Sequence, residues 1–167
     1  MKKLLFSLLA LLVAGGCIES PKGLTTVYAV RHAEKAPGRS KDPHLSKKGA
    51  ANAEALAELL LEQNIQVIYS SHFRRTRETV APLARQTGRR VRKLGANKVD
   101  ELAQAILNEH RGKRILVAGH SNTIPQLLKA LGIEEDITIG ENDYGEIYVV
   151  SINADDKAVL TKRRFGD

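Results

Sequence analysis

The stretch Thr26-Val27-Tyr28-Ala29-Val30-Arg31-His32-Ala33-Glu34-Lys35 decides how the chain is organised. Its first five residues form a short apolar run with β-branched and aromatic members, which predicts a buried strand. The run ends abruptly in Arg31-His32, a basic pair that is unusual for a core. Ligand sites in open α/β sheets form at the carboxyl ends of strands. We therefore expect His32 to carry out chemistry and Arg31 to hold an anion beside it.

Strands and helices alternate along most of the remaining chain. Strands are predicted at about 24–30, 67–69, 91–94 and 115–118, and helices at about 50–61, 73–86, 100–110 and 123–131. Ser46 is the expected N-cap of the first helix, and Pro82 is expected to bend or interrupt the second. The segments 146–152 and 158–163 flank a polar turn and predict a β-hairpin. Together these features predict one three-layer α/β/α domain over residues 24–167, with a mostly parallel sheet and the hairpin at its edge.

The three most apolar strands all end in polar residues. The ends are Arg31-His32, Ser70-Ser71-His72-Phe73-Arg74-Arg75 and Gly119-His120-Ser121-Asn122. Because the carboxyl ends of parallel strands meet at one edge of a sheet, these residues are expected to line one pocket. Histidines and arginines gathered there favour a phosphoryl group, whose oxygens match the guanidinium fork.

Three motifs in this order resemble those of the histidine phosphatase superfamily, which includes cofactor-dependent phosphoglycerate mutases and short phosphohistidine phosphatases. They are Arg31-His32-Ala33-Glu34, then Tyr69-Ser70-Ser71 followed by Arg75 and Thr79, and finally Gly119-His120-Ser121. The resemblance spans residues 25–152. It implies a phosphatase that forms a phosphohistidine and acts on a small phosphorylated substrate, with no metal or other cofactor. A mutase is not favoured, because the middle of the chain is short.

The resemblance also implies roles for matching residues. His32 would be the nucleophile, while Arg31, Arg75 and His120 would bind the transferring phosphoryl group. The neighbouring Arg74 is the alternative to Arg75. Ser70 is expected either to cap the strand end or to contact the phosphoryl group of the substrate. Ser121 is a further expected contact to the substrate, and Ser71 is an expected helix cap.

The general acid that would protonate the leaving group is not obvious. Larger relatives take a glutamate from an insertion between the second arginine and the second histidine, and here only 44 residues separate Arg75 from His120. Glu34 is the first candidate for this acid. The other candidates are Asp100, Glu101 and Asp143. Without such an acid, a substrate with a good leaving group, such as phosphohistidine or an acyl phosphate, would be favoured.

The first residues resemble an export signal. Lys2 and Lys3 precede an apolar run and then Ala14-Gly15-Gly16-Cys17, which is the layout of a signal peptide over residues 1–16. Small residues directly before the only cysteine resemble a bacterial lipobox, which implies a lipid on Cys17 and a short tether over 17–23. We therefore expect an exported protein anchored to a bacterial membrane, facing the periplasm or the cell exterior. The alternative is a plain secretory signal with an incidental cysteine.

Composition and motif spacing argue against several other classes of function. The formal charge is +7, and many cations lie within residues 74–93 as a solvated face or a surface for a phosphate-rich ligand. Nucleic acid is not an expected partner, since seven aromatic residues offer little for base stacking. No metal-ligand spacing appears, and Gly119-His120-Ser121-Asn122-Thr123 lacks the last glycine of a serine hydrolase motif. A non-catalytic phosphate-binding lipoprotein remains the alternative function.

The other three histidines have weaker expected roles. His44 and His72 are expected at the rim of the pocket, and His110 is expected at a helix C-terminus as a dipole partner.

Overall fold

Strand β1 (Thr25–Arg31) lies inside a six-stranded sheet and is hydrogen-bonded on both sides. It pairs in parallel with β4 (Arg114–Gly119) and antiparallel with β5 (Glu146–Ile152). All seven residues of β1 are buried, which explains its continuous apolar sequence. The computed structural model describes residues 23–166. The predicted signal peptide, Cys17 and most of the predicted tether lie outside the described residues.

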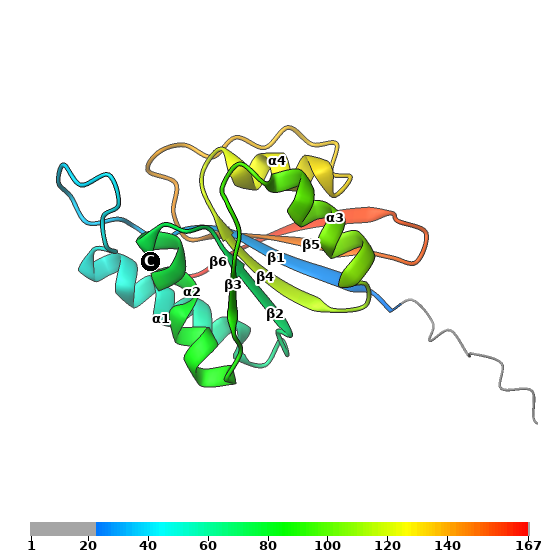
Figure 1. Ribbon diagram of the computed structural model, residues 1–167, viewed down its shortest axis with the longest axis horizontal. Helices are drawn as coiled ribbons and strands as arrows, with labels where there is room; N and C mark the ends of the chain where they lie inside the picture. The colour runs from blue at the N-terminus through cyan, green and yellow to red at the C-terminus, as the bar shows by residue number, and fades with distance from the viewer. Residues whose placement is uncertain (1–22, 167) are drawn as a thin grey trace, which may run out of the picture.

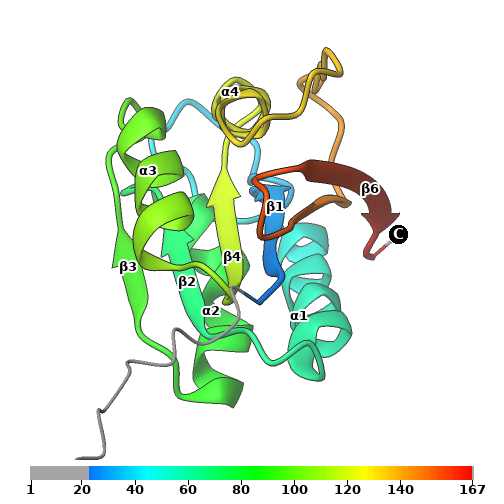
Figure 2. The same cartoon turned by 90° about the vertical axis from the view of Figure 1, so that its right-hand side faces the viewer.

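The strand order of the sheet is β3-β2-β4-β1-β5-β6. Strands β2 (Val67–Ser70) and β3 (Val91–Lys93) are parallel to β4, so four neighbouring strands point the same way. Strand β6 (Ala158–Arg164) pairs antiparallel with β5 at the far edge, as Figure 2 shows. The predicted parallel sheet with a C-terminal hairpin at its edge is confirmed.

Two helices cover each face of the sheet (Figure 1). Helices α1 (Lys47–Leu61) and α2 (Arg74–Thr87) lie on one face, and α3 (Val99–Glu109) and α4 (Thr123–Ala130) on the other. Two apolar clusters result, one containing Leu56 and Leu83 and the other containing Ile106 and Leu127. This arrangement is the predicted three-layer α/β/α architecture. Among the described residues, no helix is both long and apolar enough to span a membrane.

Several local details follow the sequence, and one in the middle of α2 does not. The hydroxyl of Ser46 accepts a hydrogen bond from the Gly49 amide (2.9 Å), which confirms the predicted N-cap of α1. Gly88 ends α2 in the left-handed conformation with φ of 65°. The expected interruption at Pro82 does not occur, and α2 runs through this residue. Pro82 is buried, so burial of its ring offsets the backbone hydrogen bond that it cannot make.

Candidate active site

Three strand-to-helix junctions form one cavity at the carboxyl edge of the parallel strands. His32 follows β1, Arg75 lies in the first turn of α2 after β2, and His120 follows β4. These strands are adjacent, in the order β2-β4-β1, so residues far apart in sequence meet. The cavity is open to solvent and has about 680 Å³ of free space. The remaining residues that line it are Arg31, Lys35, Phe73, Ala96, Ser121, Asn122 and Glu141.

His32 is buried and electrically neutral. Its Nδ1 lies 2.8 Å from the carbonyl oxygen of Ala33, so Nδ1–H donates to that carbonyl and Nε2 keeps its lone pair. Burial lowers the pKa of His32 to about 3, and the charges of Arg31 and Arg75 act in the same direction, while the Ala33 carbonyl opposes them. Above about pH 4 the imidazole therefore needs no deprotonation before it can act as a nucleophile.

Thr79 ties the backbone after His32 to the helix that carries Arg75. The Ala33 amide donates to Thr79 Oγ1 (2.9 Å), and the same hydroxyl donates to the Arg75 carbonyl (2.7 Å). Thr79 is buried, and its hydrogen bond from the Ala33 amide is shielded from water. The spacing of Arg75 and Thr79, one helical turn, therefore has a structural purpose: it fixes the backbone next to His32 relative to Arg75.

Arg31 is held by the loop that precedes β5. Its Nη1 donates to the carbonyl oxygens of Gly140 (2.5 Å) and Asp143 (3.2 Å), and its guanidinium lies 4.3 Å from the ring centroid of Tyr144. The side chain is buried, yet its Nε has no hydrogen-bond partner within the described chain. Arg31 is thus a fixed positive charge whose Nε–H can still donate a hydrogen bond.

Arg75 and its neighbour Arg74 point to different surroundings. Arg75 stacks on the Phe73 ring at 4.4 Å, its Nη2 lies 3.5 Å from His120 Nδ1, and its buried Nε has no partner within residues 23–166. Arg74 is exposed and donates to His44 Nε2 (2.9 Å) while its amide donates to Asp42 (2.8 Å). The structure therefore brings Arg75, and not Arg74, into the cavity with both histidines.

A chain of hydrogen bonds, in which each group donates to the next, orients His120. Its Nε2–H donates to Ser71 Oγ (2.9 Å), Ser71 donates to Thr76 Oγ1 (2.7 Å), and Thr76 donates to the Phe73 carbonyl (2.8 Å). This network assigns the lone pair to Nδ1, on the side of Arg75. Burial, together with Arg75 and Arg31, lowers the pKa of His120 to about 4. Ser71 thus orients a histidine, and the expectation that it caps α2 is wrong, since α2 has no side-chain cap.

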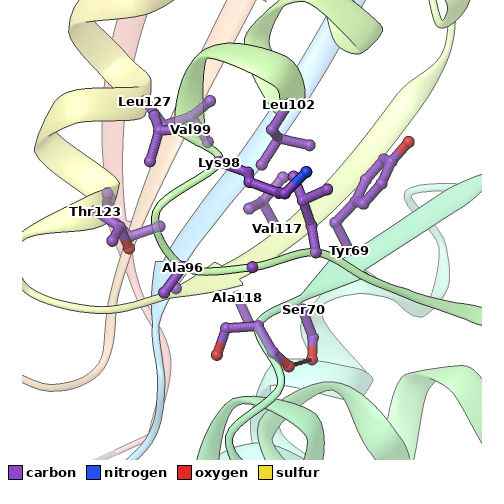
Figure 3. Close-up of a pocket in the computed structure, with 15 residues that line it drawn as sticks. Tyr69, Ser70, Ala96, Lys98, Val99, Leu102, Val117, Ala118, Thr123 and Leu127 are labelled. Carbon is purple, nitrogen blue, oxygen red and sulfur yellow. Dashed lines mark hydrogen bonds between the residues drawn. The ribbon is translucent and has the colours of Figure 1, made fainter.

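Ser70 does not reach the cavity. Its hydroxyl donates to the Ser71 carbonyl (2.7 Å), and the residue lines a separate hollow on the α3 and α4 side of the sheet (Figure 3). That hollow is largely apolar, with Val117 and Leu127 among its walls. The hydroxyl of Ser70 thus bonds to the backbone at the end of β2, in agreement with the expected cap of the strand end. Contact between Ser70 and a substrate stays a prediction. Ser121, the other predicted contact, does line the cavity with His32.

The four carboxylates considered as general acids lie elsewhere. Glu34 accepts a hydrogen bond from Ser46 Oγ (2.5 Å) and lines an adjoining cavity. Asp143 accepts from the Gly140 amide (2.8 Å) and stabilises the loop that holds Arg31. Asp100 and Glu101 lie in the first turn of α3, where Glu101 pairs with Lys98.

Glu141 is the carboxylate that lines the cavity with His32, and sequence reasoning missed it. It lies between Gly140 and Asp143, in the loop whose carbonyls hold Arg31. No helical or strand periodicity marks residues 133–145, so their role becomes visible only because β5 pairs with β1 and brings this loop to the cavity. The one signal in the sequence was Asp143, a candidate general acid two residues after Glu141.

The remaining histidines lie outside the cavity. His72 and His44 are exposed, and His44 contacts Glu78 and Arg74. His110 is buried at the end of α3, where its Nε2 lies 2.9 Å from the Tyr69 hydroxyl oxygen and burial lowers its pKa. The lowered pKa disfavours the charged form that the expected role as a helix-dipole partner would need. Within residues 23–166, no three His, Cys, Asp or Glu side chains are grouped to hold a metal ion.

Comparisons with known proteins agree with this geometry. The sequence model of the histidine phosphatase superfamily (branch 1) matches residues 27–96. An uncharacterized protein of Mycobacterium tuberculosis (strain ATCC 25618 / H37Rv) is 39% identical over 66 residues, which cover 36% of this chain and 33% of that protein. The chain thus spans about a third of the length of the curated relatives it matches.

Similar solved structures cover most of the chain. The protein histidine phosphatase SixA complexed with tungstate has a TM-score of 0.66 at 19% identity, over 83% of this chain and 96% of that one. A mycobacterial glucosyl-3-phosphoglycerate phosphatase has a TM-score of 0.67 at 16% identity, over 82% and 97%. These structures share the fold, and the sequence match includes Arg31, His32 and Arg75. Residues 27–96 thus match the histidine phosphatase superfamily, and the chain has the fold of solved histidine phosphatases.

Proposed function

We propose that the protein is a phosphatase that hydrolyses a small phosphorylated substrate through a phosphohistidine on His32. One observation carries the proposal: Arg31 and Arg75 each keep a buried Nε without a partner in the described chain, beside a neutral histidine with a free Nε2. Buried donors without partners are rare in folded proteins. A phosphoryl group would supply acceptors for both arginines and an electrophile for the histidine.

The reaction has two steps. In the first, His32 Nε2 attacks phosphorus, the bond between phosphorus and the leaving oxygen breaks, and that oxygen keeps the electron pair. In the second, water attacks the phosphohistidine, the P–N bond breaks, and the electron pair returns to Nε2. Arg31 and Arg75 stabilise the charge on the equatorial oxygens in both steps. These fixed charges supply the stabilisation that a metal ion provides in other phosphatases, so we propose that the reaction needs no metal.

His120 contributes once a phosphoryl group is present. Its Nδ1 is an acceptor that lies 3.5 Å from Arg75 Nη2. The negative charge of a bound phosphoryl group favours the imidazolium, because opposite charges nearby favour the charged form. The protonated Nδ1 can then donate to a phosphoryl oxygen, while Ser71 continues to hold Nε2.

Glu141 is placed to protonate the leaving group, because it is the carboxylate of the His32 cavity. We expect Glu141→Gln to lower kcat/KM for an alkyl phosphate, a poor leaving group, by roughly 10²-fold. For p-nitrophenyl phosphate, whose leaving group needs no proton, the change should be less than about threefold. The measurement is kcat/KM for both substrates. Glu34→Gln is the matched control, and a loss confined to that variant would transfer the role to Glu34.

We also propose that the protein is exported and anchored to a bacterial membrane by a lipid on Cys17. The support is the sequence pattern of residues 1–17 alone, since these residues lie outside the described structure. Labelled fatty acid should be incorporated into the wild-type protein in a bacterial host, and Cys17→Ser should abolish the label. Secretion of an unlabelled wild-type protein would instead indicate a plain secretory signal.

A further inference from the structure

A second cavity adjoins the cavity of His32. It has about 1010 Å³ of free space, open to solvent, and is formed by the segment after β1 and by the loop before β5. Two residues, Lys35 and Arg75, line both cavities. Tyr144, whose ring lies over Arg31, also lines the second cavity. A substrate with its phosphoryl group at His32 can therefore extend past Arg75 into this space.

Cations dominate the walls of this second cavity. Lys35, Lys41 and Arg75 line it, against the single carboxylate of Glu34. The Glu34 carboxylate accepts a hydrogen bond from Ser46, at the N-terminus of α1. Within the described residues, neither lysine has an ion pair or a side-chain hydrogen bond.

Asp42, in the same segment, is directed elsewhere. Its carboxylate accepts from the Arg74 amide and lies 3.9 Å from Arg75 Nη1. Asp42 does not line the cavity. The two lysines are thus left with uncompensated charge beside a site built for a phosphoryl group.

We propose that this cavity is a second anion subsite, so that the substrate carries another anionic group, a phosphate or carboxylate, beside the phosphoryl group that is transferred. The inference rests on the proposed phosphatase function for its assignment to a substrate. Lys41 contacts the second anion, Lys35 lies between the two groups, and Arg75 belongs to the transfer site. Asn142, a further wall residue, offers a neutral donor.

The first test compares two substrates that differ only in a second charge, phenyl phosphate and 3-carboxyphenyl phosphate. We expect the wild-type protein to have the lower KM for the carboxylated substrate, and Lys41→Glu to raise that KM by about five- to tenfold. The KM for phenyl phosphate should not change. Lys47→Glu is the matched control, because Lys47 is exposed on α1 and lines neither cavity.

The second test measures binding, so that it does not depend on turnover. Calorimetry should show that pyrophosphate binds more tightly than orthophosphate to the wild-type protein, and that Lys41→Glu removes most of the difference. Equal affinities for the two anions in the wild-type protein, or equal losses in Lys41→Glu and Lys47→Glu, would overturn the second subsite. Preferential pyrophosphate binding without turnover of either phenyl ester would instead keep the subsite and contradict the phosphatase.

Discussion

Replacing His32 with alanine is expected to lower phosphatase activity by at least about 10⁴-fold, because the proposed covalent intermediate forms on this side chain. His32 is the buried neutral imidazole whose Nε2 is free within the cavity. Release of orthophosphate from p-nitrophenyl phosphate in the presence of EDTA measures the effect. The wild-type reaction, quenched during turnover, should also contain an acid-labile phosphoprotein that His32→Ala lacks.

The same variant separates the enzyme from a phosphate-binding protein. His32→Ala should still bind orthophosphate or tungstate, since Arg31, Arg75 and His120 remain. His72→Ala is the control, because His72 is exposed and lies outside the cavity. If the wild-type protein bound orthophosphate but turned over neither aryl phosphates, acyl phosphates nor phosphohistidine, the protein would be a binder and not a phosphatase.

Two adjacent arginines should differ strongly in their effect on catalysis. Arg75→Ala should lower kcat/KM by roughly 10²- to 10³-fold, or about 3–4 kcal/mol, because Arg75 is a preorganised donor in the cavity. Arg74→Ala should change kcat/KM by less than about threefold, since Arg74 pairs with Asp42 and His44 outside the cavity. Steady-state kinetics of both variants check this. A larger loss for Arg74→Ala would contradict the assignment of Arg75.

The sequence predicted the sheet and the residues at its carboxyl edge because both depend on local patterns. An apolar run that stops at Arg31 and another that stops at Gly119 are visible without knowledge of the fold. The rule that parallel strands share an edge then places His32 and His120 together, and their rings are 5.5 Å apart. The choice of Arg75 over Arg74 came from the motif spacing of the family that the sequence resembles, and the hydrogen bonds of Thr79 now give a physical reason for that spacing.

Details that depend on side-chain partners could not be predicted in this way. Ser70 and Ser71 are identical in type and adjacent, and only the structure shows that Ser71 holds His120 while Ser70 turns to a backbone carbonyl. His110 has the position of a helix-end cation, yet its burial beside Tyr69 lowers its pKa and disfavours the charged form. Residues 140–144 follow no periodic pattern, so their contribution emerged only from the pairing of β5 with β1.

Because the loop before β5 holds Arg31, catalytic activity should require that the C-terminal part of the domain has folded. Both histidines and both arginines lie before residue 121, but the carbonyls that fix Arg31 belong to Gly140 and Asp143. That loop reaches Arg31 because β5 pairs with β1, a contact between residues more than 100 positions apart. Contacts of such long sequence separation form slowly, since loop-closure entropy opposes them. During refolding, turnover should therefore appear later than helical circular dichroism and together with the last-formed strand pairs.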